Sequence, residues 1–260
     1  MIAKAMLLGV IEGLTEFIPI SSTGHLILAG HLLAFPEPFA ATFDVAIQAG
    51  AISAALVLYW PFFSHFLKPR HWISKDAKLI FISCIPAAIV GVVAHSMIKK
   101  LLFTPLWVAI AFVVGGIALL IIEKKCIQIK ETPVAEMTYR QALAVGVAQC
   151  ASLWPGMSRS GSAIAGGLLS KMGYQSSARY SFLIAVPLII AASIFDLGKS
   201  GFLLTNAEWI AIGVGLITSF IVALASIKLF LTILNRFRLV PFAYYRIGIG
   251  SLIILVELLK

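Results

Sequence analysis

A stretch near the N-terminus, E-G-L-T-E-F-I-P-I-S-S-T-G-H from Glu12 to His25, places two glutamates, two serines and a histidine in an otherwise apolar segment. Glu12 and Glu16 are four residues apart and would share one helix face, where two like charges repel unless a cation or a shared proton lies between them. Pro19 is expected to end that helix. Ionisable groups are costly to bury, so the stretch predicts a broken helix with a functional role.

The residues after Pro19 predict an anion site. Ser21 or Ser22 can cap a second helix, whose free N–H groups and positive dipole end point back toward the carboxylates. His25 follows Ser22 by three residues, so a hydroxyl, an imidazole and backbone donors can converge on one group. We expect this group to be a phosphate. The plainer alternative is that the polar residues only cap a broken helix.

The composition indicates a membrane protein. Of the 260 residues, 60% are hydrophobic and 12% are charged, and the mean hydropathy is +1.01. These values are too apolar for a soluble domain of this length. The apolar runs have the length of membrane-spanning helices rather than of barrel strands. The net charge of +9 needs no nucleic acid as partner, because basic loops of membrane proteins meet anionic lipid. We predict an all-α integral membrane protein.

The segments on either side of Pro19 are too short for two full spans. Residues 2–35 are therefore expected to form a re-entrant hairpin, whose tip must line protein or a water-filled cavity. Three spans are predicted to follow, at about residues 43–66, 79–98 and 106–122.

The pattern restarts in the second half of the chain. Residues 146–162, G-V-A-Q-C-A-S-L-W-P-G-M-S-R-S-G-S, can be laid over residues 9–25, which aligns Ser21 with Ser158. The second copy also supplies a cation, Arg159. A second hairpin and three more spans are predicted at about residues 139–171, 178–195, 209–230 and 242–259.

Each predicted half contains an odd number of crossings, so the second copy must run with inverted topology. We predict two inverted-topology repeats, residues 1–125 and 126–260, in one membrane domain with six spans and about ten helices. If the two hairpin tips meet inside the membrane, Arg159 faces both glutamates. A guanidinium can bind two phosphate oxygens at once, so a diphosphate would be held from both sides.

These residues resemble the two signature motifs of the undecaprenyl-diphosphatase family, the bacitracin resistance proteins. The motifs are E-G-L-T-E-F-I-P-I-S-S-T-G-H at residues 12–25 and P-G-M-S-R-S-G at residues 155–161. The resemblance extends over the whole length and includes F-D-V-A-I-Q-A-G at residues 43–50, F-L-I-A-V-P at 182–187 and Y-R-I-G at 245–248.

The resemblance implies hydrolysis of undecaprenyl diphosphate to undecaprenyl phosphate and inorganic phosphate. This reaction recycles the lipid carrier of cell-wall synthesis in the bacterial plasma (inner) membrane and confers bacitracin resistance. Position by position, the resemblance implies a catalytic set of Glu12, Glu16, Ser22, His25 and Arg159. It implies a substrate-binding set of Ser21, Thr23, Gln149, Ser158 and Ser160. It also implies a divalent cation, Mg or Ca, so the glutamates could bind metal, orient a water or act as a base.

Several alternatives remain open at this point. The residues do not decide whether Ser22 or a water attacks the phosphorus. The other family of membrane lipid phosphatases is excluded, because its final histidine would fall on Ala165 and its Lys-x6-Arg-Pro element does not occur. A transporter or flippase of an anionic polyprenyl phosphate lipid is the alternative function. The expected partners are a polyprenyl diphosphate lipid and membrane lipids, and a homodimer is left open.

The basic residues predict the orientation. The loop after the first predicted span carries Lys68, Arg70, Lys75 and Lys78 and is expected to be cytoplasmic. Alternate crossing then places both termini on the periplasmic or extracellular side. From the resemblance we expect the cavity to open outward.

Overall fold

A computed structural model describes residues 1–37, 39–102, 104–126, 129–200 and 204–259. These residues form eleven α-helices, several short 3₁₀ segments and no strand. Six of the helices are long and apolar enough to cross a membrane. The prediction of an all-α membrane protein with six spans is therefore confirmed. Parts of the two predicted repeats, residues 38, 103, 127–128, 201–203 and 260, lie outside the described residues.

The N-terminal segment forms a helical hairpin. Helix α1 (Ile2–Thr15) is followed by a turn that contains Pro19, and α2 (Ser22–Leu32) runs back. Ser21 begins α2 as its N-cap, with a positive φ of 72°, and its Oγ accepts a hydrogen bond from the backbone N–H of Gly24. Proline cannot continue a helix and serine caps one, so the sequence itself dictates the break.

A second hairpin lies in the second half of the chain. It consists of α7 (Tyr139–Gln149) and α8 (Arg159–Leu169), joined by a 3₁₀ segment and a turn. Ser158 is the N-cap of α8 with φ 71°, and its Oγ accepts from the N–H of Gly161. Ser21 and Ser158, which the proposed repeat aligns, thus have nearly the same backbone geometry and the same capping contact.

The six long helices are α3 (Phe39–Leu58), α5 (Lys75–Leu102), α6 (Pro105–Lys125), α9 (Tyr174–Ser200), α10 (Asn206–Phe237) and α11 (Val240–Leu258). The first predicted span, residues 43–66, differs most from the structure. Helix α3 ends at Leu58, because Tyr59 leaves helical geometry and Pro61 starts the short helix α4 (Trp60–Ser64). Helix α10 begins earlier than predicted, at Asn206, because a capping box of Thr205 and Glu208 starts it, and it ends later, at Phe237.

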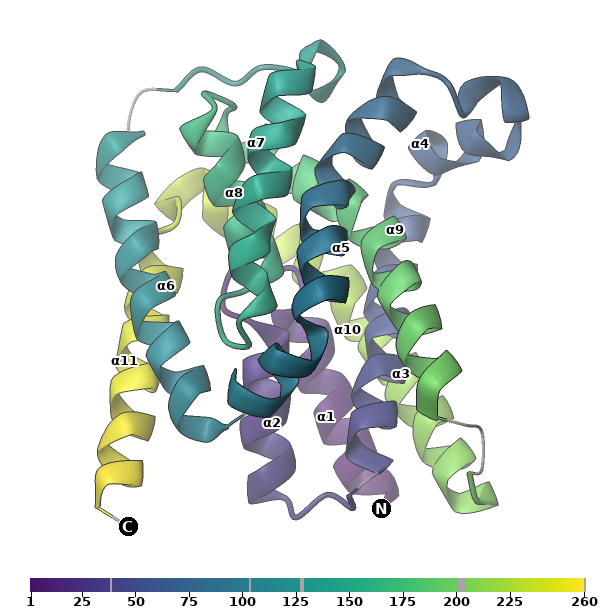
Figure 1. Cartoon of the computed structure of the whole chain (residues 1–260), viewed down its shortest axis with the longest axis vertical. Helices are drawn as coiled ribbons and strands as arrows, with labels where there is room; N and C mark the ends of the chain where they lie inside the picture. The colour runs from purple at the N-terminus through teal and green to yellow at the C-terminus, as the bar shows by residue number, and fades with distance from the viewer. Residues whose placement is uncertain (38, 103, 127–128, 201–203, 260) are drawn as a thin grey trace.

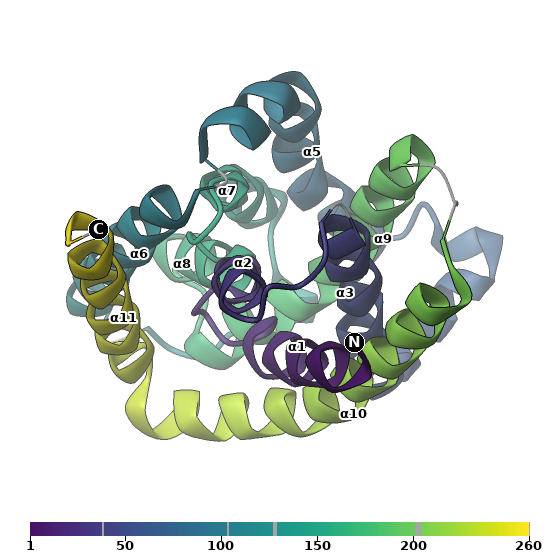
Figure 2. The same cartoon turned by 90° about the horizontal axis from the view of Figure 1, so that it is seen from below.

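The two hairpins approach each other from opposite ends of the molecule, and their tips lie near its middle (Figure 1). Viewed from below, α5, α6, α9, α10 and α11 surround them (Figure 2). The start of α1 and the end of α11 lie at one end, and α4 lies at the opposite end (Figure 1). The inverted repeat itself, with its boundaries, stays a prediction.

Glycines allow each hairpin to pack closely against a long helix. A Cβ added at Gly9 of α1 would lie 2.6 Å from the carbonyl oxygen of Gly215 in α10. One added at Gly146 of α7 would lie 2.7 Å from the carbonyl oxygen of Ser83 in α5. At the first tip, the buried Phe17 packs edge-on against Phe182 of α9, with ring centroids 5.2 Å apart. The tips are therefore held by close backbone contact and by a buried aromatic pair.

Candidate active site

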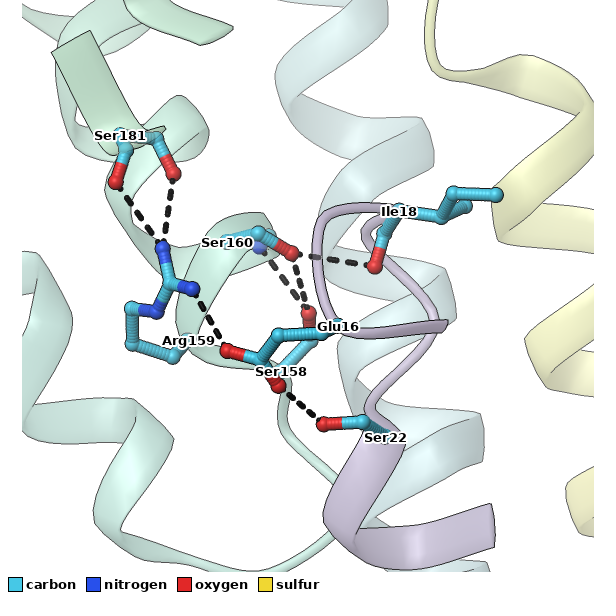
Figure 3. Close-up of polar contacts among 8 residues, drawn as sticks. Glu16, Ile18, Ser22, Ser158, Arg159, Ser160 and Ser181 are labelled. Carbon is cyan, nitrogen blue, oxygen red and sulfur yellow. Dashed lines mark hydrogen bonds and ion pairs between the residues drawn. The ribbon is translucent and has the colours of Figure 1, made fainter. Parts of the chain in front are cut away.

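Glu16 joins the two hairpin tips (Figure 3). Its Oε1 accepts a hydrogen bond from Nη2 of Arg159 at 2.6 Å, which is also an ion pair. Its Oε2 accepts a hydrogen bond from the hydroxyl of Ser22. Glu16 and Ser22 are buried, and Arg159 is nearly so. The structure thus brings a carboxylate, a hydroxyl and a cation from two distant parts of the sequence into one polar cluster. A carboxylate in this position can accept the hydroxyl proton.

Arg159 is fixed from a second direction by α9. Its Nη1 donates to the backbone oxygen of Ser181 at 2.9 Å and lies 3.4 Å from the Ser181 hydroxyl (Figure 3). The Nε atom is buried and has no hydrogen-bond partner among the described residues. The guanidinium therefore spans the distance between the first hairpin and α9 with two different nitrogens.

Glu12 lies one helical turn before Glu16 and is completely buried. Neither of its carboxylate oxygens finds a hydrogen-bond donor among the described residues. The charged groups that interact electrostatically with Glu12 are two acidic residues, Glu16 and Asp44 of α3, and one cation, Arg159. A buried carboxylate without a donor is costly unless it holds a proton or a cation, so Glu12 is a candidate for either.

The carboxylates fit a cation only in part. No group of three His, Cys, Asp or Glu side chains among the described residues is placed to hold a metal ion. Magnesium, however, is commonly bound through one or two protein carboxylates together with substrate phosphates and waters. Glu12 and Glu16 fit a cation shared with a diphosphate and do not form a complete site by themselves.

The serines of the predicted substrate-binding set build the tips. Ser21 and Ser158 cap their helices, as described above. Ser158 also contacts the hydroxyl of Ser160 at 3.1 Å, and Ser160 donates to the backbone oxygen of Ile18 in the first tip at 3.0 Å (Figure 3). Ser160 thus links the second hairpin directly to the first. These hydroxyls shape the place where the two helix N-termini meet.

The two other residues of the predicted substrate-binding set are Thr23 and Gln149. Thr23 is partly buried in the first turn of α2, next to the polar cluster in sequence. Gln149 is fully buried and donates from Nε2 to the backbone oxygen of Ser83 in α5 at 2.9 Å. Its Oε1 has no hydrogen-bond partner among the described residues. Gln149 therefore ties α7 to α5 and keeps one unused acceptor.

His25 makes its side-chain hydrogen bonds to residues outside the predicted catalytic set. Its Nδ1 lies 2.7 Å from the backbone oxygen of Ser21, and its Nε2 lies 2.8 Å from the hydroxyl of Tyr245. Both ring nitrogens have these partners, and no hydrogen bond joins the imidazole to Ser22 or Glu16 among the described residues. The convergence of hydroxyl and imidazole on one bound group stays a prediction.

Arg246 is not among the predicted site residues, yet it contacts the turns of both hairpins. Its side chain is 1% exposed. Nη1 donates to the backbone oxygen of Pro19 at 3.3 Å, and Nη2 donates to those of Gly156 at 2.9 Å and Ala111 at 3.1 Å. Arg246 therefore holds the turns of both hairpins together from α11. The available signal was an arginine inside an apolar span, which is a functional candidate by default.

Comparisons with known proteins agree with the resemblance of the motifs. Residues 5–252 match the model of one protein family, described as bacitracin resistance protein BacA. The chain is 45% identical over 253 residues to a protein named undecaprenyl-diphosphatase from Nitratidesulfovibrio vulgaris (strain DP4), with 96% of both chains covered. It is 46% identical over 258 residues to a protein of the same name from Maridesulfovibrio salexigens, with 96% of both covered. It is 43% identical over 259 residues to undecaprenyl-diphosphatase 1 from Bacillus cereus (strain ZK / E33L), with 98% of both covered.

Proposed function

Because the chain belongs to the family of bacitracin resistance protein BacA, we propose that it hydrolyses undecaprenyl diphosphate to undecaprenyl phosphate and inorganic phosphate. Relatives at 43% to 46% identity over nearly the full chain carry the name of this activity. The observation that carries the proposal is the polar cluster at the meeting hairpin tips, where Glu16 contacts both Arg159 and Ser22.

The two tips supply the means to bind a diphosphate. The N-termini of α2 and α8 both lie at the cluster, and first-turn N–H groups at helix N-termini bind phosphate oxygens. Arg159 adds a planar cation that can contact two oxygens at once. Catalysis of phosphoryl transfer depends mainly on such positioning and charge neutralisation. A divalent cation bound with the substrate at Glu12 and Glu16 would neutralise further phosphate charge.

The contact between Ser22 and Glu16 supports Ser22 as the nucleophile. In the proposed reaction, Ser22 Oγ attacks the terminal phosphorus while Glu16 takes the hydroxyl proton. The bond from phosphorus to the bridging oxygen breaks, and undecaprenyl phosphate leaves. A water then attacks the phosphoserine, which releases inorganic phosphate and restores the serine. The other route, direct attack by water on the terminal phosphorus, would leave Ser22 unmodified.

Phosphate release from undecaprenyl diphosphate by purified protein in detergent tests this function. We expect turnover by the wild type and a loss on the order of a thousandfold or more in Ser22→Ala, as for removal of a nucleophile. Ser53→Ala is the matched control, because among the described residues this hydroxyl bonds only the backbone of its own helix. A phosphorylated Ser22 trapped during turnover supports the covalent route, and full activity of Ser22→Ala supports attack by water.

A second candidate function is transport of an anionic polyprenyl phosphate lipid. The entry of the hairpins from opposite ends (Figure 1) favours it, because broken helices that meet at mid-membrane are typical of transporters. The detergent assay separates the two functions, since transport needs two compartments and hydrolysis does not. Absence of phosphate release from a folded wild-type protein would favour transport.

The six apolar helices make the chain a multi-pass membrane protein. We further propose that it lies in the bacterial plasma membrane with both termini on the periplasmic or extracellular side. The basic loop that includes Lys68 and Arg70 follows α4, at the end opposite to the termini (Figure 1), which supports this orientation. A homodimer stays a prediction.

A further inference from the structure

The ring of His25 is held by three elements of the fold. Its own helix α2 contributes the backbone oxygen of Ser21, and α11 contributes the hydroxyl of Tyr245. The rings of His25 and Tyr245 are nearly parallel, with an interplanar angle of 10° and centroids 5.7 Å apart. Phe112 of α6 packs against the imidazole at a centroid distance of 5.2 Å. Arg246, next to Tyr245 in α11, is the charged group that interacts electrostatically with this ring.

These contacts determine where the imidazole carries its hydrogen. The backbone oxygen of Ser21 can only accept, so Nδ1 of His25 must be the donor. In the neutral ring Nε2 then has a free lone pair, and the hydroxyl of Tyr245 must donate to it. A continuous chain of hydrogen bonds therefore runs from Tyr245 through His25 to the carbonyl of Ser21.

This chain ends at the turn that carries the proposed nucleophile. Ser21 is the N-cap of α2, its φ of 72° is unfavourable for a residue with a side chain, and Ser22 follows it directly. A contact to the Ser21 carbonyl restricts the peptide group between Ser21 and Ser22. The hydrogen bond from Tyr245 thus acts on the orientation of Ser22 without touching it.

We propose that Tyr245 is a positioning residue of the hydrolysis reaction, which holds His25 as the Nδ1–H tautomer and through it orients the turn of Ser21 and Ser22. The inference rests on the proposed function. It also gives the contact between the imidazole and α11 a role: His25 supports the turn that carries Ser22. Tyr245 is 44% exposed, so burial alone does not require its hydroxyl to be bonded.

The kinetic test replaces Tyr245 by phenylalanine, which keeps the ring and removes the hydroxyl. We expect a three- to tenfold lower kcat with KM within twofold, about the effect of one hydrogen bond. In a His25→Ala background the same change should have no further effect, because the two residues act in one chain. Tyr244→Phe is the matched control, since Tyr244 is the preceding residue in α11 and is 63% exposed. Wild-type kcat in Tyr245→Phe, a change in KM alone, or an equal loss in both backgrounds would overturn the proposal.

A second measurement does not depend on activity. Nitrogen NMR of isotope-labelled histidine in the detergent-solubilised protein reports the tautomer, and the His25 signal is identified by its loss in His25→Gln. We expect the Nδ1–H form in the wild type, and in Tyr245→Phe a shifted Nε2 signal, because that nitrogen loses its hydrogen bond while Nδ1 keeps the Ser21 carbonyl. The Nε2–H form in the wild type would refute the hydrogen-bond chain. If the wild type shows the expected tautomer but releases no phosphate, the proposed function fails while the geometry stands.

Discussion

Arg159→Lys is the substitution that tests the polar cluster most directly. It keeps a positive charge and removes the planar fork. In the structure Arg159 uses Nη2 for Glu16 at 2.6 Å and Nη1 for the Ser181 carbonyl at 2.9 Å. A lysine has one nitrogen and cannot lie at both places, so one of the two contacts is lost.

The magnitude follows from this geometry. Removing one partner of a buried, hydrogen-bonded charge pair costs about 2 to 5 kcal/mol. Lysine retains the charge and one contact, so we expect the lower part of this range for Arg159→Lys, about 2 to 3 kcal/mol. At about 1.4 kcal/mol for each factor of ten, this corresponds to a 30- to 150-fold lower kcat/KM.

The assay is phosphate release from undecaprenyl diphosphate in detergent, with a thermal unfolding measurement on the same preparation. Arg236→Lys serves as the control, because Arg236 is exposed at the end of α10 and stacks on its neighbour Phe237. The activity of Arg236→Lys should equal that of the wild type. If Arg159→Lys is folded and retains activity within threefold, the two-nitrogen contact has no role in the reaction and Arg159 acts only as a general positive charge.

Three further predictions concern the carboxylate, the packing and the orientation. Glu16→Gln should leave a folded protein with hydrolysis reduced by a factor on the order of a hundred or more, since the amide cannot take the proton from Ser22; wild-type turnover would contradict the role of Glu16. Gly9→Ala should lower stability by about 1 to 3 kcal/mol in thermal unfolding, because its Cβ would meet the α10 backbone, whereas Gly30→Ala, with open space around it, should not. In a background without native cysteines, a cysteine replacing Ser74 should resist an impermeant maleimide in intact cells while one replacing Thr205 reacts, and the reverse pattern would overturn the orientation.

The sequence was informative where local chemistry decides the structure. Pro19 and the capping serines predict the broken helix, and the spacing of Glu12 and Glu16 predicts a shared face that needs a cation. Because the motif around Arg159 repeats the pattern of the first hairpin, the contact between the two tips could also be predicted from the sequence. Each of these predictions depends on residues a few positions apart or on a repeated pattern.

The remaining features depend on contacts between residues far apart in the chain. Tyr245 and His25 are separated by 220 positions, and no local pattern shows which tyrosine of α11 faces α2. The role of Arg246 is likewise visible only when Pro19 and Gly156 are seen to lie beside it. For His25, helical spacing indicates a Cα near Ser22, but the contact of its ring with Tyr245 of α11 could not be predicted from the sequence.

The serines that begin α2 and α8 have a consequence for the tolerance of these positions to substitution. Ser21 and Ser158 have φ values of 72° and 71°, which cost any residue with a side chain roughly 1 to 3 kcal/mol. The hydrogen bond to the capping hydroxyl offsets about 1 kcal/mol of this backbone strain. Alanine would keep the backbone cost and lose the cap, whereas glycine would lose the cap but remove the cost. At these two sites, residues that have a Cβ but no capping oxygen should therefore lower the free energy of unfolding most, and glycine should lower it least. This order is the opposite of the preference along the surrounding helices.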